Sequence, residues 1–332
     1  MKIYTDQDAD IAPLKGKQIA ILGYGNQGRA QALNLRDSGL NVIVGNREDE
    51  YREHAQEDQF DVFTIAEAAR TADLLAILTT DESQPKVWSE QIAPGVESGN
   101  ILMWSSGYNV SYDLINPPAD TDVVMVAPRM TGTMVRTLFE RGKGAMAQVA
   151  VNQDASGNAR DYMMAYTKGI GCTRGGAMES SFREEAEMDL FAEQVVWSGL
   201  VAWIEECFAI GVEQGFSQEL MVLELYASGE AAEIMGMMGE RGFYKQMGHH
   251  STTSQYGTLT RSQGLLSDEI KQKMRELVVR DIKQGAFAKE WSSEQAGGSK
   301  RLVELKEKAM KGPMSLAEDR IIPLVQKAHS LD

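Results

Sequence analysis

Three glycines near the start of the chain are spaced as in loops that bind a dinucleotide. Gly23, Gly25 and Gly28 form the pattern GxGxxG between an apolar run and a segment with helical spacing. Glycine allows a tight turn there and lets the backbone approach a pyrophosphate at the N-terminus of the following helix. A glycine-rich turn that binds nothing is the alternative. We predict a cofactor-binding loop made of Gly23, Tyr24, Gly25, Asn26, Gln27 and Gly28.

Charged side chains follow about twenty residues later, where such folds contact the adenosine ribose. The segment reads Arg47-Glu48-Asp49-Glu50-Tyr51-Arg52. Arg47 and Arg52 could grip the 2′-phosphate of NADPH, whereas the three acidic side chains between them would repel that phosphate. The acids could instead accept hydrogen bonds from the free ribose of NADH. The pattern leaves both cofactors open and slightly favours NADH.

Acidic residues in the second half of the chain could bind a metal ion. Asp189 and Glu193 lie four residues apart, so on a helix both carboxylates would project from one face and could share a hard cation. Glu224 lies in the apolar run LMVLELY, where a buried carboxylate would need a partner. A pair of solvent-exposed acids is the common alternative.

The first half of the chain alternates apolar runs with helical segments. Residues 17–22 read as a strand, and the helical segment after the glycine loop ends at Gly39. Thr64 and Glu67 form a capping box at the start of another helix. Further apolar runs predict strands at 41–45, 74–78, 101–104, 123–127 and 146–151. This alternation is typical of a parallel sheet in an α/β domain.

The second half of the chain has a different pattern. After the glycine-rich stretch 169–176, strand signals fade, and segments rich in Glu, Met, Leu and Ala predict helices from Phe182 to about Gly242. The polar stretch 249–262 interrupts this pattern, and further helical segments follow. We expect an α/β dinucleotide-binding domain at 1–180 and a helical domain at 181–332.

The composition excludes several classes of protein. The 332 residues carry a formal net charge of −15, which would repel a nucleic-acid backbone. Cys172 and Cys207 form no CxxC pair, which indicates a reducing compartment. The first residues lack the apolar core of a signal peptide, and we find no run of about 18 apolar residues. We expect a cytoplasmic protein that binds neither nucleic acid nor membrane.

Several separate segments, in the same order, resemble those of the short form of the ketol-acid reductoisomerase family. They are GYGNQG at 23–28, LTTDE at 78–82, VAPR at 126–129, FREEAEMDLFAEQ at 182–194 and SQYG at 254–257. Members of this family convert acetohydroxy acids into the dihydroxy acids of branched-chain amino-acid synthesis, by an alkyl shift at two Mg²⁺ ions and then hydride transfer from a nicotinamide. The resemblance implies a Rossmann domain at 1–180, a knotted all-helical domain for metal, substrate and dimerisation at 181–332, and an active site shared across a homodimer.

The resemblance also implies roles for individual side chains. Asp189 and Glu193 match the metal-binding acids of one subunit, and Glu224 and Ser251 match residues that the partner subunit supplies. We therefore predict that Asp189, Glu193 and Glu224 bind Mg²⁺. Arg129 is predicted to clamp an anionic group of the substrate, and Ser251 to form a hydrogen bond with it.

Other positions depart from the family's pattern. Ser106 stands where the family carries a histidine, Arg129 replaces a lysine, and Thr133 replaces a second histidine. Ser228 takes the place of a second glutamate from the partner subunit, four residues after Glu224. Arginine, whose pKa lies above about 12, is a poor proton donor or acceptor where lysine could serve. Because the alkyl shift needs both substrate oxygens polarised, losing a carboxylate should weaken the second Mg²⁺ site.

We therefore expect an oxidoreductase that uses NADH or NADPH and Mg²⁺ to reduce a small anionic 2-oxo or hydroxy-keto acid, with an altered substrate or without the alkyl shift. An ordinary ketol-acid reductoisomerase and a non-catalytic dinucleotide-binding protein are the alternatives. His249 and His250 directly precede Ser251, and either could supply a relocated base. Histidines in a polar loop, however, usually have no special task.

Overall fold

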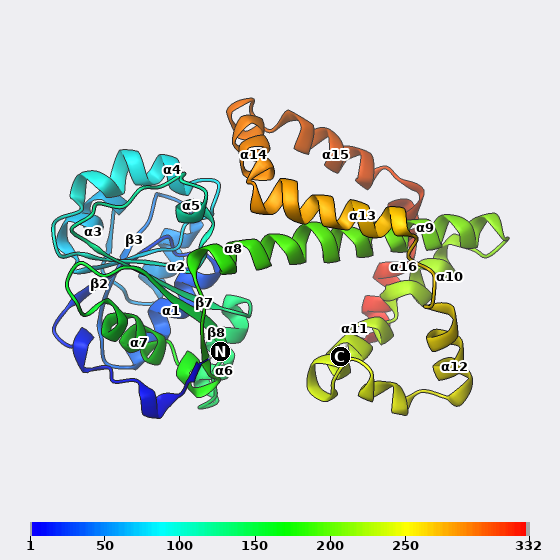
Figure 1. Ribbon diagram of the computed structural model, residues 1–332, viewed down its shortest axis with the longest axis horizontal. Helices are drawn as coiled ribbons and strands as arrows, with labels where there is room; N and C mark the ends of the chain where they lie inside the picture. The colour runs from blue at the N-terminus through cyan, green and yellow to red at the C-terminus, as the bar shows by residue number, and fades with distance from the viewer. Residues whose placement is uncertain (1, 330–332) are drawn as a thin grey trace. The chain divides into compact units, whose positions relative to one another are not determined.

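The computed structural model describes residues 2–329, and the chain folds as two compact units. The first unit ends at Asp189 and the second begins at Leu190. The boundary expected from the sequence, between residues 180 and 181, lies directly before helix α8 (Phe182–Phe191), which crosses the border between the units. Figure 1 labels the helices and strands of both units.

The first unit is built on one nine-stranded sheet of order β1-β9-β8-β7-β6-β5-β2-β3-β4. Its strands are β1 (Ile3–Tyr4), β2 (Gln18–Leu22), β3 (Asn41–Gly45), β4 (Val62–Phe63), β5 (Leu74–Ile77), β6 (Ile101–Trp104), β7 (Asp122–Pro128), β8 (Ala147–Gln153) and β9 (Ala177–Glu179). The predicted apolar runs correspond to β2, β3, β5, β6, β7 and β8. The sequence did not predict the short strands β1, β4 and β9.

Most neighbouring strands run parallel, as predicted, but two pairs do not. Strand β8 runs antiparallel to β7, and β1 runs antiparallel to β9. The expectation of an all-parallel sheet is therefore wrong for the apolar run 146–151. A run that is buried on both faces has the same composition in either direction, so its residues do not reveal which way the strand points.

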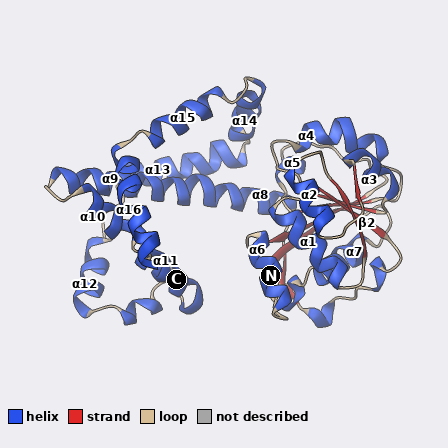
Figure 2. Ribbon diagram, turned by 180° about the vertical axis from the view of Figure 1, so that it is seen from behind, coloured by secondary structure: helices blue, strands red, loops and turns tan. Residues whose placement is uncertain are grey.

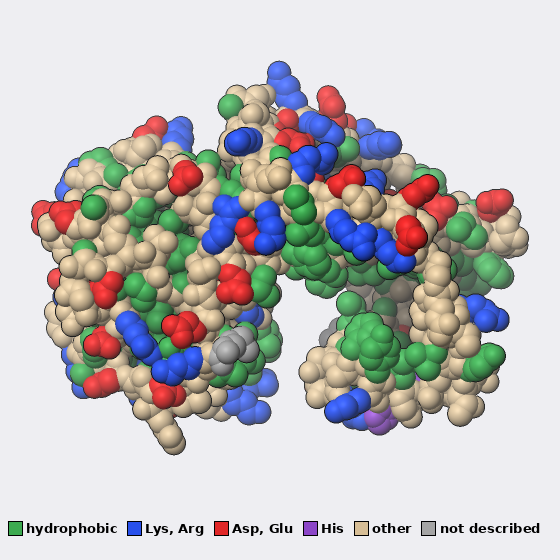
Figure 3. Space-filling view, in the orientation of Figure 1, with side chains coloured by type: hydrophobic (Ala, Val, Ile, Leu, Met, Phe, Trp, Pro, Cys, Tyr) green, Lys and Arg blue, Asp and Glu red, His purple; other side chains and the backbone are tan. Residues whose placement is uncertain are grey.

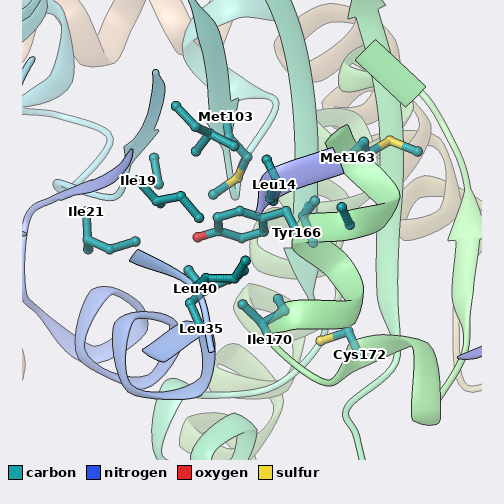
Figure 4. Close-up of a cluster of buried hydrophobic side chains, with 14 of the residues drawn as sticks. Leu14, Ile19, Ile21, Leu35, Leu40, Met103, Met163, Tyr166, Ile170 and Cys172 are labelled. Atoms are coloured by element: carbon teal, nitrogen blue, oxygen red, sulfur yellow. The ribbon is translucent and has the colours of Figure 1, made fainter. Parts of the chain in front are cut away.

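Alternate residues of the central strands point to opposite faces of the sheet, and both faces are covered. Ile19 and Ile21 of β2 lie in one core with helices α1 and α7, whereas Ala20 and Leu22 lie in the other with α3. In the first core, aliphatic side chains from the sheet and the helices surround the buried ring of Tyr166 (Figure 4). Burial on both faces explains why these strands are apolar throughout.

The helices of the first unit begin and end at residues suited to those positions. Helix α1 starts directly after Gly25 and ends before Gly39, whose φ of +80° favours glycine. Helix α3 has the predicted capping box of Thr64 and Glu67. The helices are α1 (Asn26–Asp37), α2 (Glu50–Glu57), α3 (Ile65–Thr71), α4 (Gln84–Val87), α5 (Tyr108–Ser111), α6 (Gly132–Glu140), α7 (Ala159–Gly169) and α8.

In the described part of the second unit, all regular elements are helices, as predicted, and Figure 2 shows strands in the first unit alone. The helices are α9 (Ser198–Glu213), α10 (Gln218–Val222), α11 (Glu230–Arg241), α12 (Thr252–Arg261), α13 (Asp268–Glu276), α14 (Ala286–Ala296), α15 (Lys300–Met310) and α16 (Pro313–His329). The expectation that residues 249–262 interrupt the helices is wrong. Ser251 caps a helix there by accepting the N–H of Ser254, so a polar segment forms α12.

One helical run has an unusual surface. Among the described residues, Phe182–Glu213 is long and apolar enough to cross a membrane by length and composition alone, so the expectation that no segment could do so is not met by those two criteria. Its exposed apolar side chains include Phe191, Trp197, Val201 and Trp203. Figure 3 shows apolar side chains, in green, on the surface in the region of α8 and α9.

Candidate functional site

The carboxyl ends of β2 and β5 form the switch point of the sheet. The chain winds outward from these neighbouring strands in opposite directions, because β3 lies beyond β2 and β6 lies beyond β5. Ligands of such sheets bind at this point. Gly23, which follows β2 with φ +100°, is so close to the end of β5 that a Cβ would lie 2.8 Å from the Thr79 nitrogen. The glycine loop therefore lies at the position where a dinucleotide is expected.

The other two glycines of the loop differ in the space around them. A Cβ on Gly28 would lie 1.9 Å from the carbonyl oxygen of Gly23, whereas nothing lies within 4 Å of a Cβ on Gly25. Gly25 directly precedes α1, whose first backbone N–H groups have no carbonyl partner within the helix. The open side of Gly25 therefore gives a phosphate access to the helix N-terminus.

A polar atom in the same crevice also fits a bound dinucleotide. The hydroxyl of Thr79 is buried and has no hydrogen-bond partner among the described residues. Buried hydroxyls in folded proteins normally have a partner, which a ligand can supply. Together with the open space at Gly25, this hydroxyl shows that the residues present fit the phosphate-bearing part of a nicotinamide cofactor.

A chain of hydrogen bonds between side chains fixes the glycine loop from behind. The hydroxyl of Tyr166 donates to Oε1 of Gln31 (2.8 Å), and Nε2 of Gln31 donates to Oε1 of Gln27 (3.0 Å). Nε2 of Gln27 in turn donates to the carbonyl of Met130 (2.8 Å). The loop is thus attached both to α7, through Tyr166, and to the turn after β7, through Met130.

The remaining side chains of the predicted loop have structural partners. The ring of Tyr24 is buried, and its hydroxyl donates to Asp58 (2.8 Å). Oδ1 of Asn26 accepts the N–H of Gly132. The side chains of Tyr24, Asn26 and Gln27 therefore position the loop, and direct contact between these residues and a cofactor stays a prediction.

The two arginines of the ribose segment are both engaged. Arg52 donates to three backbone carbonyls, those of Asn46 (3.0 Å), Val62 (3.4 Å) and Phe63 (3.0 Å). Nε of Arg47 donates to Oδ2 of Asp49 (2.6 Å), and the side chain of Arg47 is 80% exposed. Asp49 also caps α2 by accepting the N–H groups of Tyr51 and Arg52. The negative charge of Asp49 therefore offsets the positive charge of Arg47.

A hollow of about 330 Å³ lies at the ends of β5, β6 and β7, on the same edge of the sheet as the glycine loop. Its lining residues are Asp81, Ser105, Ser106, Pro128, Arg129, Met130, Glu185 and Asp189. Three of them are carboxylates and one is an arginine. Because the loops after three strands and the start of α8 meet here, the hollow is the candidate substrate site of the first unit.

Arg129 is the centre of this hollow. One terminal nitrogen of its guanidinium donates to Oε1 of Glu185 (2.9 Å), and the other donates to Oδ1 of Asp189 (2.7 Å). The second oxygen of Glu185 accepts the N–H of Gly107 (2.7 Å), and the residue is 2% exposed. The two carboxylates raise the pKa of Arg129, although burial acts against them. Arg129 is therefore a fixed and permanently charged cation that faces the hollow.

Ser106 and Thr133, like Arg129, depart from the family's pattern, and Ser106 lines the hollow. The hydroxyl of Ser106 donates to Oδ2 of Asp81 (3.3 Å) and accepts the N–H of Tyr108 (3.3 Å). Thr133 is exposed near the start of α6 and does not line this hollow. At the hollow, the position of Ser106 therefore offers a hydroxyl that is hydrogen-bonded to the neighbouring carboxylate of Asp81.

The stability of the protein should depend on the ionisation of Glu185. Burial raises the pKa of Glu185 to about 7 from an ordinary value of 4.5, against the Gly107 N–H and Arg129, which lower it. At a pH between the pKa of the unfolded chain and that of the folded protein, the folded protein binds more protons. Its free energy of unfolding therefore falls as the pH rises through this range. Between pH 5 and pH 8 the native chain should lose up to about 3 kcal/mol of its free energy of unfolding through this group, and Glu185→Gln should not show this loss.

Urea unfolding at the two pH values measures this difference. Glu184→Gln, which changes an exposed neighbour on α8, is the control and should follow the native chain at both pH values. Equal pH dependence of Glu185→Gln and the native chain would show that Glu185 does not titrate in this range.

The residues of the first unit do not fit a divalent cation as they stand. Glu185 and Asp189 each direct an oxygen at the guanidinium of Arg129, and no group of three or more His, Cys, Asp or Glu side chains suited to a metal ion occurs among the described residues. Of the predicted ligands, Asp189 belongs to the first unit, whereas Glu193 and Glu224 are exposed in the second. Their assignment to Mg²⁺ stays a prediction.

The other predicted residues of the second unit have local partners. Ser251 is the cap of α12, and its contact with substrate stays a prediction. His249 contacts Arg241, and Nε2 of His250 lies 2.8 Å from Oε1 of Gln246. A catalytic role for either histidine is best tested by Gln substitution, because unchanged turnover in both variants would remove them from the mechanism.

Sequence reasoning missed two carboxylates that line the hollow. Glu185 lies four residues before Asp189, the same spacing that drew attention to Asp189 and Glu193. The spacing alone could not tell which of the two pairs lines a site, and the burial of Glu185 is what distinguishes them. Asp81 lies in the LTTDE segment, just after an apolar run. Its place at the carboxyl end of a predicted parallel strand was the signal that could have found it.

Comparisons with known proteins agree over nearly the whole chain. Residues 13–176 match the family described as acetohydroxy acid isomeroreductase, NADPH-binding domain, and residues 182–326 match ketol-acid reductoisomerase, C-terminal domain. A protein of Pyrobaculum calidifontis named ketol-acid reductoisomerase (NADP(+)) is 47% identical over 315 residues, which cover 94% of this chain and 95% of that protein. One of the same name from Caldivirga maquilingensis is 43% identical over 305 residues, 92% of each chain.

A solved structure gives the same result. The structure of an NADH-preferring ketol-acid reductoisomerase from an uncultured archean superposes with a TM-score of 0.91 at 35% sequence identity, and each chain is covered completely. The relatives therefore share the fold of both units and the order of the elements that form the crevice and the hollow.

Proposed function

Because this chain belongs to the ketol-acid reductoisomerase family, we propose that it converts an acetohydroxy acid into a dihydroxy acid with a nicotinamide cofactor. Family membership makes it an NAD(P)-dependent oxidoreductase, so the alternative of a non-catalytic binding protein is set aside. Relatives at 43–47% identity carry the ordinary family name. Their names support the ordinary reaction better than the altered reaction that the departures at Ser106, Arg129 and Thr133 suggested.

The arrangement of the first unit accounts for the reductive half of this reaction. A bound nicotinamide cofactor would supply a hydride to the carbonyl carbon of the substrate, and a proton from solvent would complete the alcohol. Arg129 offers N–H groups to the carboxylate and the carbonyl oxygen of a 2-oxo acid, which stabilises negative charge as it develops on that oxygen. The single observation that carries the proposal is the position of this arginine on the same edge of the sheet as the glycine loop.

Reduction without the alkyl shift is a second candidate function. It is favoured by the ion pairs of Arg129 with both Glu185 and Asp189, because these pairs occupy carboxylate oxygens that would otherwise be free to bind Mg²⁺. The alkyl shift needs two substrate oxygens polarised at once, whereas hydride transfer to a 2-oxo acid needs only one.

Two substrates separate the candidates. 2-Acetolactate must rearrange before it is reduced, whereas 3-hydroxy-3-methyl-2-oxobutanoate, the product of that rearrangement, needs reduction only. We expect cofactor oxidation with both substrates in the presence of Mg²⁺ if the family reaction is intact, and with the second alone if the alkyl shift is lost. Oxidation with neither substrate would overturn both candidates.

We propose that the cofactor is NADH rather than NADPH. The relatives leave this open, since those from Pyrobaculum and Caldivirga are named for NADP(+) and the solved structure is described as NADH-preferring. The guanidinium of Arg52 is directed at backbone carbonyls, and the charge of Arg47 is offset by Asp49, so both arginines are already engaged where a 2′-phosphate would need them. We expect kcat/KM for NADH to exceed that for NADPH by about tenfold or more, the effect of roughly one lost charged contact.

A substitution at Asp49 tests this assignment. Asp49→Ser keeps a residue that can cap α2 and releases Arg47, so it should shift the ratio of kcat/KM values toward NADPH by about tenfold. Glu57→Gln removes one charge at the far end of the same helix and should leave the ratio unchanged. A native preference for NADPH, or an equal shift in both variants, would contradict the assignment.

We propose that the protein is a homodimer or a higher homo-oligomer of the cytoplasm. The support is the exposed apolar surface of the run Phe182–Glu213, which a second copy would cover. Light scattering without detergent should then give at least twice the mass of one chain. A monomeric mass, or material that stays in solution only with detergent, would contradict this proposal.

A further inference from the structure

Arg129 lies between two carboxylates of α8 and donates a hydrogen bond to each. Glu185 and Asp189 are one helical turn apart on α8, and the guanidinium joins them with one terminal nitrogen on each. The side chain of Arg129 remains 35% exposed and lines the hollow together with Asp81. The pair of carboxylates therefore already has a cation, and that cation faces the space where a substrate would bind.

A divalent cation could not join this arrangement without displacing the arginine. Both oxygens of Glu185 accept hydrogen bonds, one from Arg129 and one from the N–H of Gly107, so neither is turned freely toward a metal ion. Mg²⁺ demands near-octahedral geometry from oxygen ligands and gives up its water reluctantly. An arginine that stayed in place would also repel it. The geometry is thus that of an ion-pair cluster rather than that of a cation site awaiting its ion.

We propose that the guanidinium of Arg129 substitutes for a divalent cation at Glu185 and Asp189, and that it meets the carboxylate and carbonyl oxygens of a 2-oxo acid directly. A guanidinium has five N–H donors in a planar fork, and the two carboxylates use two of them. The remaining donors suit a planar 2-oxo carboxylate. The inference rests on the proposed function only in taking the substrate to be such an anion.

Metal binding to the protein without substrate or cofactor tests the substitution. In calorimetric titrations with MgCl₂ after EDTA treatment, Arg129→Met should bind Mg²⁺ at least tenfold more tightly than the native chain. Arg129→Lys keeps the charge but is a point charge that does not span both carboxylates, so its affinity should lie between the two. The lysine variant also keeps the test valid if Arg129→Met fails to fold.

A matched control is available on the same helix. Arg183 pairs with Glu187 on α8 (2.6 Å) and does not line the hollow, so Arg183→Met removes an arginine and breaks an ion pair elsewhere. Its Mg²⁺ affinity should equal that of the native chain. Submillimolar Mg²⁺ binding by the native chain that neither Arg129 variant tightens, or equal tightening by Arg183→Met, would overturn the proposal.

The effect of EDTA on reduction provides a second readout. With 3-hydroxy-3-methyl-2-oxobutanoate, which needs no rearrangement, the rate of cofactor oxidation in EDTA should stay within about twofold of that in Mg²⁺. A tenfold loss in EDTA would contradict the substitution. Failure of the proposed function would instead appear as no oxidation in either condition, and the titrations without substrate would still decide the role of Arg129.

Discussion

Arg129→Met is expected to lower kcat/KM for a 2-oxo acid or ketol-acid substrate by about 100-fold or more. The loss of a charge-assisted, bidentate contact with an anion accounts for about 3 kcal/mol, which corresponds to that factor. The effect should lie in KM as well as kcat, because Arg129 would contact both the carboxylate and the reacting carbonyl. Steady-state kinetics with saturating NADH measure it.

The same variant should also lose stability. Glu185 is 2% exposed, and without Arg129 its carboxylate is buried beside Asp189 with only the Gly107 N–H as a partner. Breaking a buried ion pair costs about 3–5 kcal/mol, and the partial exposure of Arg129 should reduce the cost toward the lower value. The loss should appear at pH 8, where Glu185 is ionised, and should be smaller at pH 5, where Glu185 is protonated. The double variant Arg129→Met with Glu185→Gln should regain most of the stability and none of the activity. Recovery of activity would show that Arg129 acts only through folding.

Gly28→Ala and Gly25→Ala should fail in different ways. A Cβ on Gly28 would lie 1.9 Å from the carbonyl oxygen of Gly23, and neither backbone can move without disturbing the start of α1. We expect this variant to lose about 3 kcal/mol of stability and to bind no cofactor. Nothing lies near a Cβ on Gly25, so Gly25→Ala should fold normally and yet raise the Kd for NADH at least tenfold, because the added methyl group takes the space of the pyrophosphate.

Thermal unfolding and fluorescence titration with NADH separate the two effects. Gly236→Ala on α11, where the space is also open, is the control: it should leave the NADH affinity unchanged and should not lower the stability, because Ala favours a helix interior over Gly. Normal NADH affinity in Gly25→Ala would show that the pyrophosphate does not lie against this residue. Normal stability in Gly28→Ala would show that the contact with Gly23 is looser than the structure indicates.

The fold of the first unit could be predicted from the sequence because its signals are local. The strands β3 and β6 begin and end at the predicted residues, and the capping box at Thr64 is present. The direction of β8 could not be predicted, since pairing with β7 depends on the path of the chain between them. The two-residue strands β1 and β4 are too short to produce an apolar pattern.

The candidate site was harder to predict than the fold, because it depends on which side chains are partnered. The charge of Arg52 suggested a role at the ribose, but two of the backbone carbonyls that it reaches belong to β4, ten and eleven residues further along the chain. Glu224 lies in an apolar run, where a buried carboxylate would need a partner, but it is exposed in a π-helical turn, Leu223–Ala227. The burial of Glu185 follows from the approach of Gly107, which no helical pattern reveals.

The hydrogen-bond chain from Tyr166 to Met130 has a consequence for the energetics of cofactor binding. Each amide in the chain has one orientation only, since Gln31 and Gln27 both accept through Oε1 and donate through Nε2. A loop that is already immobile in the free enzyme loses little conformational entropy when the coenzyme docks. Tyr166→Phe would remove the hydrogen bond at the distant end of this series. The surface that meets the coenzyme would stay unchanged, but the entropic cost of ordering the loop would return. A residue remote from the coenzyme therefore helps to determine its residence time.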